Sequence, residues 1–127
     1  MKFENKRKNH LKSKIIIDQL FSTGNAITIP PFRLVFLEVE NSDFAGVQTL
    51  VSVPKRRFKL AVTRNLIKRK ISEAYRLNAT GFQLKTSEKN QHIAIGFIYI
   101  GRKDLDLEHA QVKMKEILEK LSLKLKN

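Results

Sequence analysis

The run HIAIGFIYIG, at residues 92–101, is the most informative stretch for the architecture of this 127-residue chain. It is apolar at nearly every position and rich in the β-branched and aromatic residues that favour strands. Such a run predicts a strand buried on both faces, because a half-buried strand would alternate apolar and polar residues. One central sheet with helices packed on it is therefore expected, which is an α/β (α+β two-layer) sandwich.

Two further strands are predicted before this run. In FRLVFLEVE (32–40) alternate residues divide into two faces, Phe32, Leu34 and Phe36 on one and Arg33, Val35 and Leu37 on the other. VQTLVSV (47–53) is rich in β-branched residues, and we expect it to pair with 32–40 as a hairpin through the turn NSDFAG (41–46). Pro30-Pro31 is expected to force extended chain, and a short extra strand at 26–29 is an additional option.

Helices are predicted at 12–22, at 61–77 and from Asp104 or Asp106 to about residue 125, whereas the polar stretch 78–90 is expected to be a loop. Each helix has apolar residues at i, i+3 and i+4 spacing: Ile16, Ile17, Leu20 and Phe21 in the first, Leu60, Ile67, Ile71, Ala74 and Tyr75 in the second, and Leu107, Ala110, Met114, Ile117, Leu118, Leu121 and Leu125 in the third. The order is α-β-β-α-β-α in a single domain, 1–127, of which 1–10 is expected to be a flexible basic arm.

The net charge of +13, from 25 Lys+Arg and 12 Asp+Glu, indicates a polyanionic partner. Nucleic acid is the leading candidate and an acidic membrane surface the second. The basic arm is either a solubilising tail or a segment that becomes ordered on the same polyanion. With no cysteine, no apolar run of about 20 residues and no signal-peptide pattern, we expect a cytoplasmic protein.

Residues 55–76 carry nine cations and a single acid, and five of these cations lie in the stretch AVTRNLIKRKISEAYR, at residues 61–76. On a helical wheel, one arc of this helix carries Asn65, Lys68, Arg69, Ser72 and Arg76, while Arg64 borders the apolar side and Lys70 lies at the other edge, with Glu73 as the single acid. A charged face that only keeps a helix soluble usually mixes signs, because like charges at i, i+4 repel each other. The pattern therefore favours binding of RNA phosphates by Arg and Lys over a merely solvated face.

No catalytic constellation is recognisable in the sequence. The three histidines have no metal-ligand spacing, and no serine belongs to a nucleophile motif. The acids Asp104, Asp106 and Glu108 stand where a helix N-terminus favours negative charge. By itself the chain is typical of a binding protein. The face with Arg33, Val35 and Leu37, beside Ile17 and Phe21, is either plain core or a cleft for an extended nucleic-acid strand.

The stretch SVPKRRFKLAVTRNLIKRKISEAYR (52–76) resembles the signature of the bacterial ribonuclease P protein subunit. In that family a strand ending in S-V-S/P-K-K/R precedes an A-V-x-R-N-R-x-K-R helix, and the element order along nearly the whole chain also agrees. HLKSKIIIDQLFSTG (10–24) resembles the first helix of the family. The chain departs from the family pattern at Leu66, where Arg is usual, at Lys59-Leu60, where Gly-Asn is common, and at Ser72, where a basic residue is frequent.

The resemblance implies a left-handed β-α-β crossover and a cytoplasmic ribonucleoprotein endonuclease that removes the 5′ leader of precursor tRNA. The catalytic RNA and its Mg²⁺ would perform the chemistry, with no further protein partner, no membrane and no metal site or catalytic residue on the protein. By position, Arg64, Asn65, Lys68 and Arg69 would contact the catalytic RNA, together with Lys70 and Arg76 of the basic helix. Ile17, Phe21, Val35, Leu37 and Lys55, with Arg33, would line the leader cleft.

One alternative is a ribosomal or other structured-RNA-binding protein without a role in cleavage. Another is a nuclease that needs no RNA subunit. The Arg64-Asn65 pair in its sequence context favours the ribonuclease P subunit over the first, and the missing catalytic constellation disfavours the second.

Overall fold

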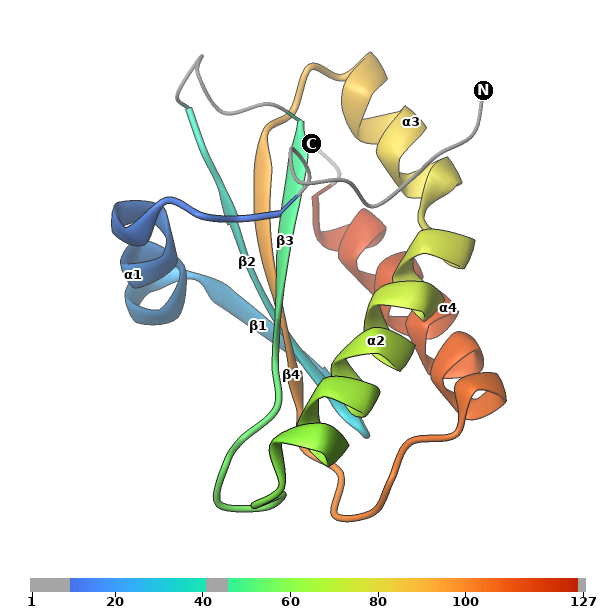
Figure 1. The fold of residues 1–127 in the computed structure, drawn as a ribbon. Helices are drawn as coiled ribbons and strands as arrows, with labels where there is room; N and C mark the ends of the chain where they lie inside the picture. Colours follow the sequence, from blue (N-terminus) through green and yellow to red (C-terminus); the bar gives the residue numbers. More distant parts are fainter. Residues whose placement is uncertain (1–9, 41–45, 126–127) are drawn as a thin grey trace.

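The computed structural model describes residues 10–40 and 46–125, which form one sheet with helices on both of its faces (Figure 1). The elements in chain order are α1 (Lys14–Thr23), β1 (Asn25–Ile29), β2 (Phe32–Glu38), β3 (Val47–Ser52), α2 (Ala61–Asn78), α3 (Thr80–Glu88), β4 (Ile93–Tyr99) and α4 (Leu107–Lys124). The α+β fold and every predicted helix and strand are confirmed. Residues 1–9 of the predicted arm and 41–45 of the predicted turn lie outside the described residues.

The strand order is β1-β2-β4-β3, so the predicted hairpin of β2 with β3 is wrong. β4 lies between them, antiparallel to β2 and parallel to β3, with Val47 opposite Ile93 and Ser52 opposite Ile98. The sequence of β4 explains this position, because a strand that is apolar on both faces needs hydrogen-bonded neighbours and cover on both sides. Residues 93–97 are all buried.

The connection from β3 to β4 runs through α2 and α3, which lie on the same face of the sheet as α4 (Figure 1). It joins two adjacent parallel strands and has the left-handed sense that the resemblance implies, whereas such crossovers are right-handed in about 98% of cases. The crossover places α2 along one side of the molecule, where one of its faces packs on the sheet and α4 and the other is open to solvent.

Two elements differ from the sequence-based expectation. Asn25–Ile29 is a full strand that pairs with β2 from Asn25 opposite Phe36 to Ile29 opposite Phe32. Pro30-Pro31 therefore makes the tight turn of a hairpin rather than extended chain, with a cis peptide bond between the two prolines. Thr80–Glu88 is a helix, α3, not a loop, and it buries Phe82 and Thr86 at i, i+4 spacing.

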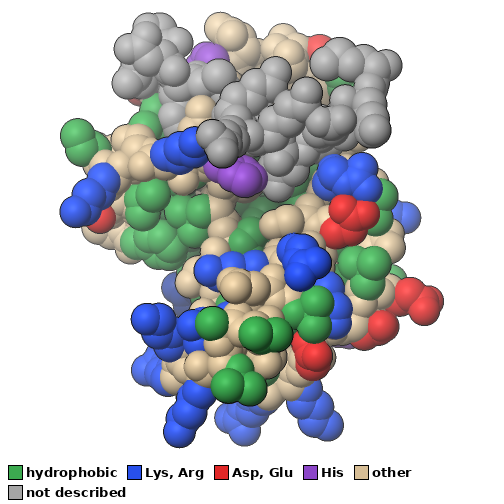
Figure 2. Space-filling model, in the orientation of Figure 1, with side chains coloured by type: hydrophobic (Ala, Val, Ile, Leu, Met, Phe, Trp, Pro, Cys, Tyr) green, Lys and Arg blue, Asp and Glu red, His purple; other side chains and the backbone are tan. Residues whose placement is uncertain are grey.

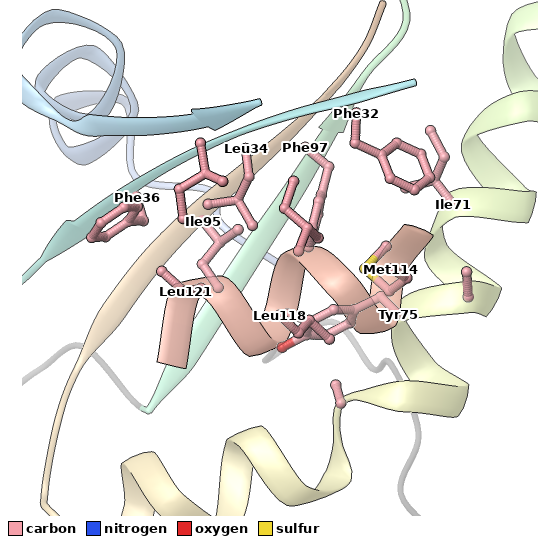
Figure 3. Close-up of a cluster of buried hydrophobic side chains, with 14 of the residues drawn as sticks. Phe32, Leu34, Phe36, Ile71, Tyr75, Ile95, Phe97, Met114, Leu118 and Leu121 are labelled. Atoms are coloured by element: carbon pink, nitrogen blue, oxygen red, sulfur yellow. The ribbon is translucent and has the colours of Figure 1, made fainter. Parts of the chain in front are cut away.

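The main core lies between the sheet and helices α2 and α4 (Figure 3). Phe32, Leu34 and Phe36 of β2 point into it, as the alternation predicts, and meet Met114, Leu118 and Leu121 of α4. Each fully buried Leu, Ile or Phe contributes about 1.5–3 kcal/mol, so this layer supplies most of the stability that holds α2 in place. The α4 stripe is confirmed, and Asp106 caps that helix by accepting a hydrogen bond from the His109 amide at 3.3 Å.

A smaller core lies on the opposite face, under α1. Leu20 is fully buried there with Val35, Ala94 and Leu11. Gly96 of β4 makes room for it, because a Cβ on Gly96 would lie 3.0 Å from Val35 Cγ2 and 3.4 Å from Leu20 Cδ2. At the end of α1, a Cβ on Gly24 would lie 2.3 Å from the carbonyl oxygen of Leu20, so only glycine fits this turn into β1.

Candidate nucleic-acid interface

Helix α2 is held by four buried side chains, Ile67, Ile71, Ala74 and Tyr75, all of which the spacing predicts. The fifth predicted member of this apolar set, Leu60, is 70% exposed, because it is the N-cap residue and its extended backbone turns the side chain away from the core. Burial raises the pKa of the Tyr75 hydroxyl above its ordinary range, and this hydroxyl accepts a hydrogen bond from Gln83 of α3 at 3.2 Å. The helix therefore presents its remaining side chains from a rigid support.

The side chains of Asn65, Lys68 and Arg69 form the open part of the outward face of α2. Asn65 and Arg69 are exposed and Lys68 is half-buried. Within residues 10–40 and 46–125, none of the three makes a hydrogen bond or ion pair with another part of the chain. These donors are therefore available to an external anion, as their position in the sequence predicts.

A groove of about 550 Å³ runs along this face, and Figure 2 shows Lys and Arg side chains over the same region. Its lining combines cations and one acid with apolar walls: His10, Leu66, Arg69, Lys70, Ser72, Glu73, Arg76 and Leu107. Three predicted RNA-binding residues, Arg69, Lys70 and Arg76, thus border one depression. Leu66, which replaces the usual family Arg, is 37% exposed at its edge.

Arg76 is paired with the acid of this face. Its Nε and Nη2 atoms donate to the two carboxylate oxygens of Glu73, at 2.9 and 2.7 Å. The hydrogen bond from Arg76 holds the pKa of the Glu73 carboxyl below its ordinary value, so the carboxylate is ionised at neutral pH. A phosphate that binds Arg76 in the same two-pronged geometry has to replace this carboxylate.

Arg64 and Lys70 are directed at backbone carbonyls rather than at solvent. Arg64 Nη1 donates to the carbonyl oxygens of Phe58 and Lys59, at 2.8 and 3.0 Å. Lys70 Nζ donates to the carbonyl oxygen of Leu105 at 2.7 Å and lies 3.8 Å from Asp104 Oδ1. Both residues lie on the predicted helix, but their charged atoms support neighbouring loops. The sequence carries no signal that separates them from Lys68 and Arg69.

The second predicted site lies on the face of the sheet that carries α1. Strand register places Arg33 beside Thr28, Ile98 and then Ser52 in one row across the sheet. Val35, Gly96 and Leu50 form the next row, and Val35 is only 6% exposed because Leu20 covers it. The row of Arg33 is the open one. Ile98 and Ser52 belong to it although the sequence analysis does not single them out, because only the β3–β4 register brings them there.

Helix α1 crosses the sheet, from the contact of Leu11 with the edge strand at Thr49 to Gly24 beside Phe36. Ile17 and Phe21 lie on one side of the buried Leu20, since successive helical residues are about 100° apart. Phe21 is 49% exposed, so it is a surface residue and not core. Figure 2 shows hydrophobic side chains on the side of the molecule where Figure 1 places α1, with Lys and Arg side chains below them.

The other side of α1 faces the end of β2. Here a groove of about 610 Å³ is lined by Ile15, Ile16, Gln19, Thr23, Leu37, Glu38, Val39 and Glu40. Leu37, which is predicted for one cleft with Phe21, lines this groove, and Phe21 is not among the residues that line it. The two glutamates make this groove unfavourable for a polyanion. Of the six predicted cleft residues, Ile17 packs against the smaller core together with Ile98 of the open row, whereas Phe21, Arg33 and Lys55 are exposed.

The acids that the sequence analysis singles out have structural partners. Asp106 caps α4, and Asp104 accepts a hydrogen bond from the Leu105 amide at 3.0 Å while facing Lys70. Over the described part of the chain, no three His, Cys, Asp or Glu residues are grouped as metal ligands. No described helix is both long and apolar enough to cross a membrane. The arrangement can bind and orient an anionic polymer through side-chain donors.

A family model described as Ribonuclease P matches residues 5–122. The ribonuclease P protein component of Porphyromonas gingivalis W83 is 31% identical over 106 residues, which are 84% of this chain and 77% of that protein. The component of Petrotoga mobilis is 32% identical over 113 residues, which are 85% of each chain. The Staphylococcus aureus RNase P protein has the same fold, with a TM-score of 0.66 at 20% identity over 89% of this chain and 94% of that one. A mutant of the Staphylococcus aureus protein has the same fold with a TM-score of 0.71 at 19% identity, over 90% of this chain and 88% of that one.

Proposed function

The chain belongs to the ribonuclease P protein family, and from this membership we propose that it binds two RNA molecules through different faces. As a ribonuclease P protein component it is the accessory subunit of an RNA-catalysed endonuclease that processes tRNA. In this proposal the outward face of α2 binds the catalytic RNA. The open row beside α1 holds the 5′ leader of precursor tRNA.

The observation that carries the first assignment is the set of donors on α2 that have no partner within residues 10–40 and 46–125. Asn65, Lys68 and Arg69 project from a helix whose opposite side is packed in the core. Arg and Lys donate charge-assisted hydrogen bonds to phosphate oxygens, and each phosphate contact releases counterions. Because the helix is already folded, little conformational entropy is lost when the RNA binds. Arg76 joins this face once a phosphate replaces Glu73.

The leader assignment rests on the mixture of groups around the open row. Phe21 offers a half-exposed ring on which an unpaired base can stack, and stacking is tolerant of sequence. Arg33 and Lys55 are exposed cations that can contact the phosphates of the same strand. A single-stranded leader needs such a combination, whereas a folded duplex cannot offer unstacked bases.

We assign the Mg²⁺ of the reaction to the RNA, because RNA phosphates are hard oxygen ligands and the described residues contain no group of three potential metal ligands. The protein contributes positive charge and position. We place the complex in the cytoplasm, which suits a chain without cysteine.

The experiment is cleavage of a precursor tRNA by a bacterial ribonuclease P RNA at low Mg²⁺, with and without this protein. We expect cleavage to be faster with the protein, and faster still relative to RNA alone as the leader is lengthened. The RNA partner should come from the same source as the protein. A protein that binds RNA tightly but leaves the cleavage rate unchanged would instead fit a ribosomal role. Cleavage by purified protein without RNA would contradict the accessory assignment.

A further inference from the structure

Two cationic loops leave the sheet at the same end. The β3–α2 loop (53–60) carries the exposed residues Lys55, Arg56 and Lys59, and the β4–α4 loop (100–106) carries the exposed residues Arg102 and Lys103. They are adjacent because β3 and β4 are parallel neighbours, with Ser52 opposite Ile98. Figure 1 shows both loops below the sheet, and Figure 2 shows Lys and Arg side chains at this end. We call Arg56, Lys59, Arg102 and Lys103 the sheet-end surface.

The two loops are fixed to each other by side chains. Arg57 Nη1 of the first loop donates to the carbonyl oxygen of Ile100, in the second, at 2.9 Å. The Phe58 ring packs against Tyr99, with 5.8 Å between the ring centroids. The Tyr99 hydroxyl in turn donates to the carbonyl oxygen of Lys103. The loops therefore form one unit, and the cations on them are presented with a fixed spacing.

The acids of the second loop do not cancel its cations. Asp104 faces Lys70, with 3.8 Å between the charged atoms, and Asp106 caps α4. Each acid is thus compensated by a positive group of its own, a lysine or the N-terminus of a helix. Arg102 and Lys103 are exposed and make no ion pair or side-chain hydrogen bond with the described residues. Among the described residues, no acid forms an ion pair with Arg56, Lys59, Arg102 or Lys103.

We propose that the sheet-end surface is an additional RNA-contact site that binds backbone phosphates, separate from the outward face of α2. This inference rests on the proposed function, because it takes RNA to be the ligand. The residue types bind phosphates, and the aromatic residue of these loops, Phe58, is packed on Tyr99 and does not offer a ring for stacking. The site therefore contacts RNA without reading its sequence. The phosphates belong either to the catalytic RNA or to the leader.

The test uses the double variant Arg102→Ala/Lys103→Ala in the reconstituted holoenzyme. Its control is Lys120→Ala/Lys124→Ala, which removes the same charge from exposed positions at the far end of α4. Affinity for ribonuclease P RNA and for precursor tRNA is measured over a range of salt concentrations. Two lost phosphate contacts lower the slope of log K against log salt by roughly 1.4–1.8, and the control should leave it nearly unchanged. Thermal unfolding of both variants should match the unchanged protein.

The RNA with which the slope falls shows which of the two RNAs supplies the phosphates. A fall with the catalytic RNA alone places the surface on that RNA. A fall that appears only with precursors bearing a long leader, and not with mature tRNA, places it on the leader. Equal slopes for the variant and the control, with the catalytic RNA as well as with precursor tRNA, would overturn the inference. If the unchanged protein fails to stimulate cleavage, the proposed function itself fails, which is a different result.

Discussion

The Nη1 atom of Arg64 lies 2.8 Å from the carbonyl oxygen of Phe58, six residues earlier in the chain. The same atom also donates to the carbonyl oxygen of Lys59 at 3.0 Å. A residue at the start of the basic helix thereby closes the loop that joins this helix to β3. Arg64 therefore holds this loop in place, in addition to carrying a positive charge on α2.

Replacing Arg64 by Ala should lower the free energy of unfolding by about 1–3 kcal/mol, because hydrogen bonds from a charged group to the loop are lost. Lys68→Ala removes the same charge from the next turn but breaks no hydrogen bond to the described chain. Chemical denaturation of the two variants compares them directly. If both variants lose the same stability, or neither does, the hydrogen bond from Arg64 to Phe58 does not contribute to the free energy of unfolding.

The double variant Lys68→Ala/Arg69→Ala should bind ribonuclease P RNA more weakly, and the slope of log K against log salt should fall by roughly 1.4–1.8. Stability should change by no more than about 0.5 kcal/mol, since neither side chain is packed in the core. Salt titrations of RNA binding measure the slope. Lys120→Ala/Lys124→Ala is the matched control, and a slope that stays constant in both variants would remove this face from the interface.

Phe21→Ala should reduce affinity for precursor tRNA with a leader more than for mature tRNA, by about 1–3 kcal/mol if one base stacks on the ring. Phe21 is 49% exposed, so the fold should tolerate the change better than truncation of a buried Phe. Ile15→Ala is a suitable control, because Ile15 is 72% exposed on the same helix but lines the groove on its other side. Equal losses for the two RNAs would argue against leader binding at this position.

Glu73→Gln should tighten RNA binding severalfold, because it removes a carboxylate that competes with phosphate for Arg76. The lowered pKa of Glu73 means that the carboxylate contributes to stability above its unfolded-state pKa, and this contribution is lost as the pH falls through the folded-state pKa. The effect on binding should therefore be constant around neutral pH and should shrink only under acid conditions. Filter binding between pH 5 and 8 would show this, and weaker binding by the variant would contradict the competition between Glu73 and phosphate.

Gly96→Ala should destabilise the protein by about 1–3 kcal/mol, since the added methyl group would approach Val35 and Leu20 in a packed core. The affected contact is the one that holds α1 on the sheet, so leader-dependent affinity should fall together with stability. Thermal unfolding and precursor binding are both measured. Unchanged unfolding would mean that Leu20 can move without loss.

Periodicity predicts the elements whose burial is one-sided. The buried residues of α2 and α4 and the division of β2 into two faces all follow from spacing, because one side of each element contacts the core. Periodicity does not predict α3, because its two buried residues, Phe82 and Thr86, make too short a stripe to indicate a helix. Periodicity does not predict which strands pair either. β3 follows β2 in the sequence, but the more hydrophobic β4 lies between them in the sheet.

The candidate site is predicted as a set of residues and only partly as an arrangement. Arg64, Lys68 and Arg69 are indistinguishable as cations on one helix, yet the first is used to bind carbonyls of its own chain. Leu37 and Phe21 are predicted to share a cleft, but Leu37 lines the groove beside Ile15 and Ile16, and the lining of this groove does not include Phe21. Both differences depend on how elements pack, which residue spacing within one element does not encode.

The central position of β4 also affects the order in which the protein can mature. Among the described residues, β3 pairs with residues 93–98 of β4, and its other backbone contacts of this kind are those of His10 and Leu11 at Thr49. On the ribosome, a nascent chain that has not reached Ile93 cannot connect its edge strand to the β1–β2 hairpin, and the helix between them has no complete sheet to pack on. Folding of helix α2 is thus delayed until residues 93–98 have been synthesised, as expected for non-local strand pairing. The cationic face of α2 takes its folded shape only after β4 has joined the sheet.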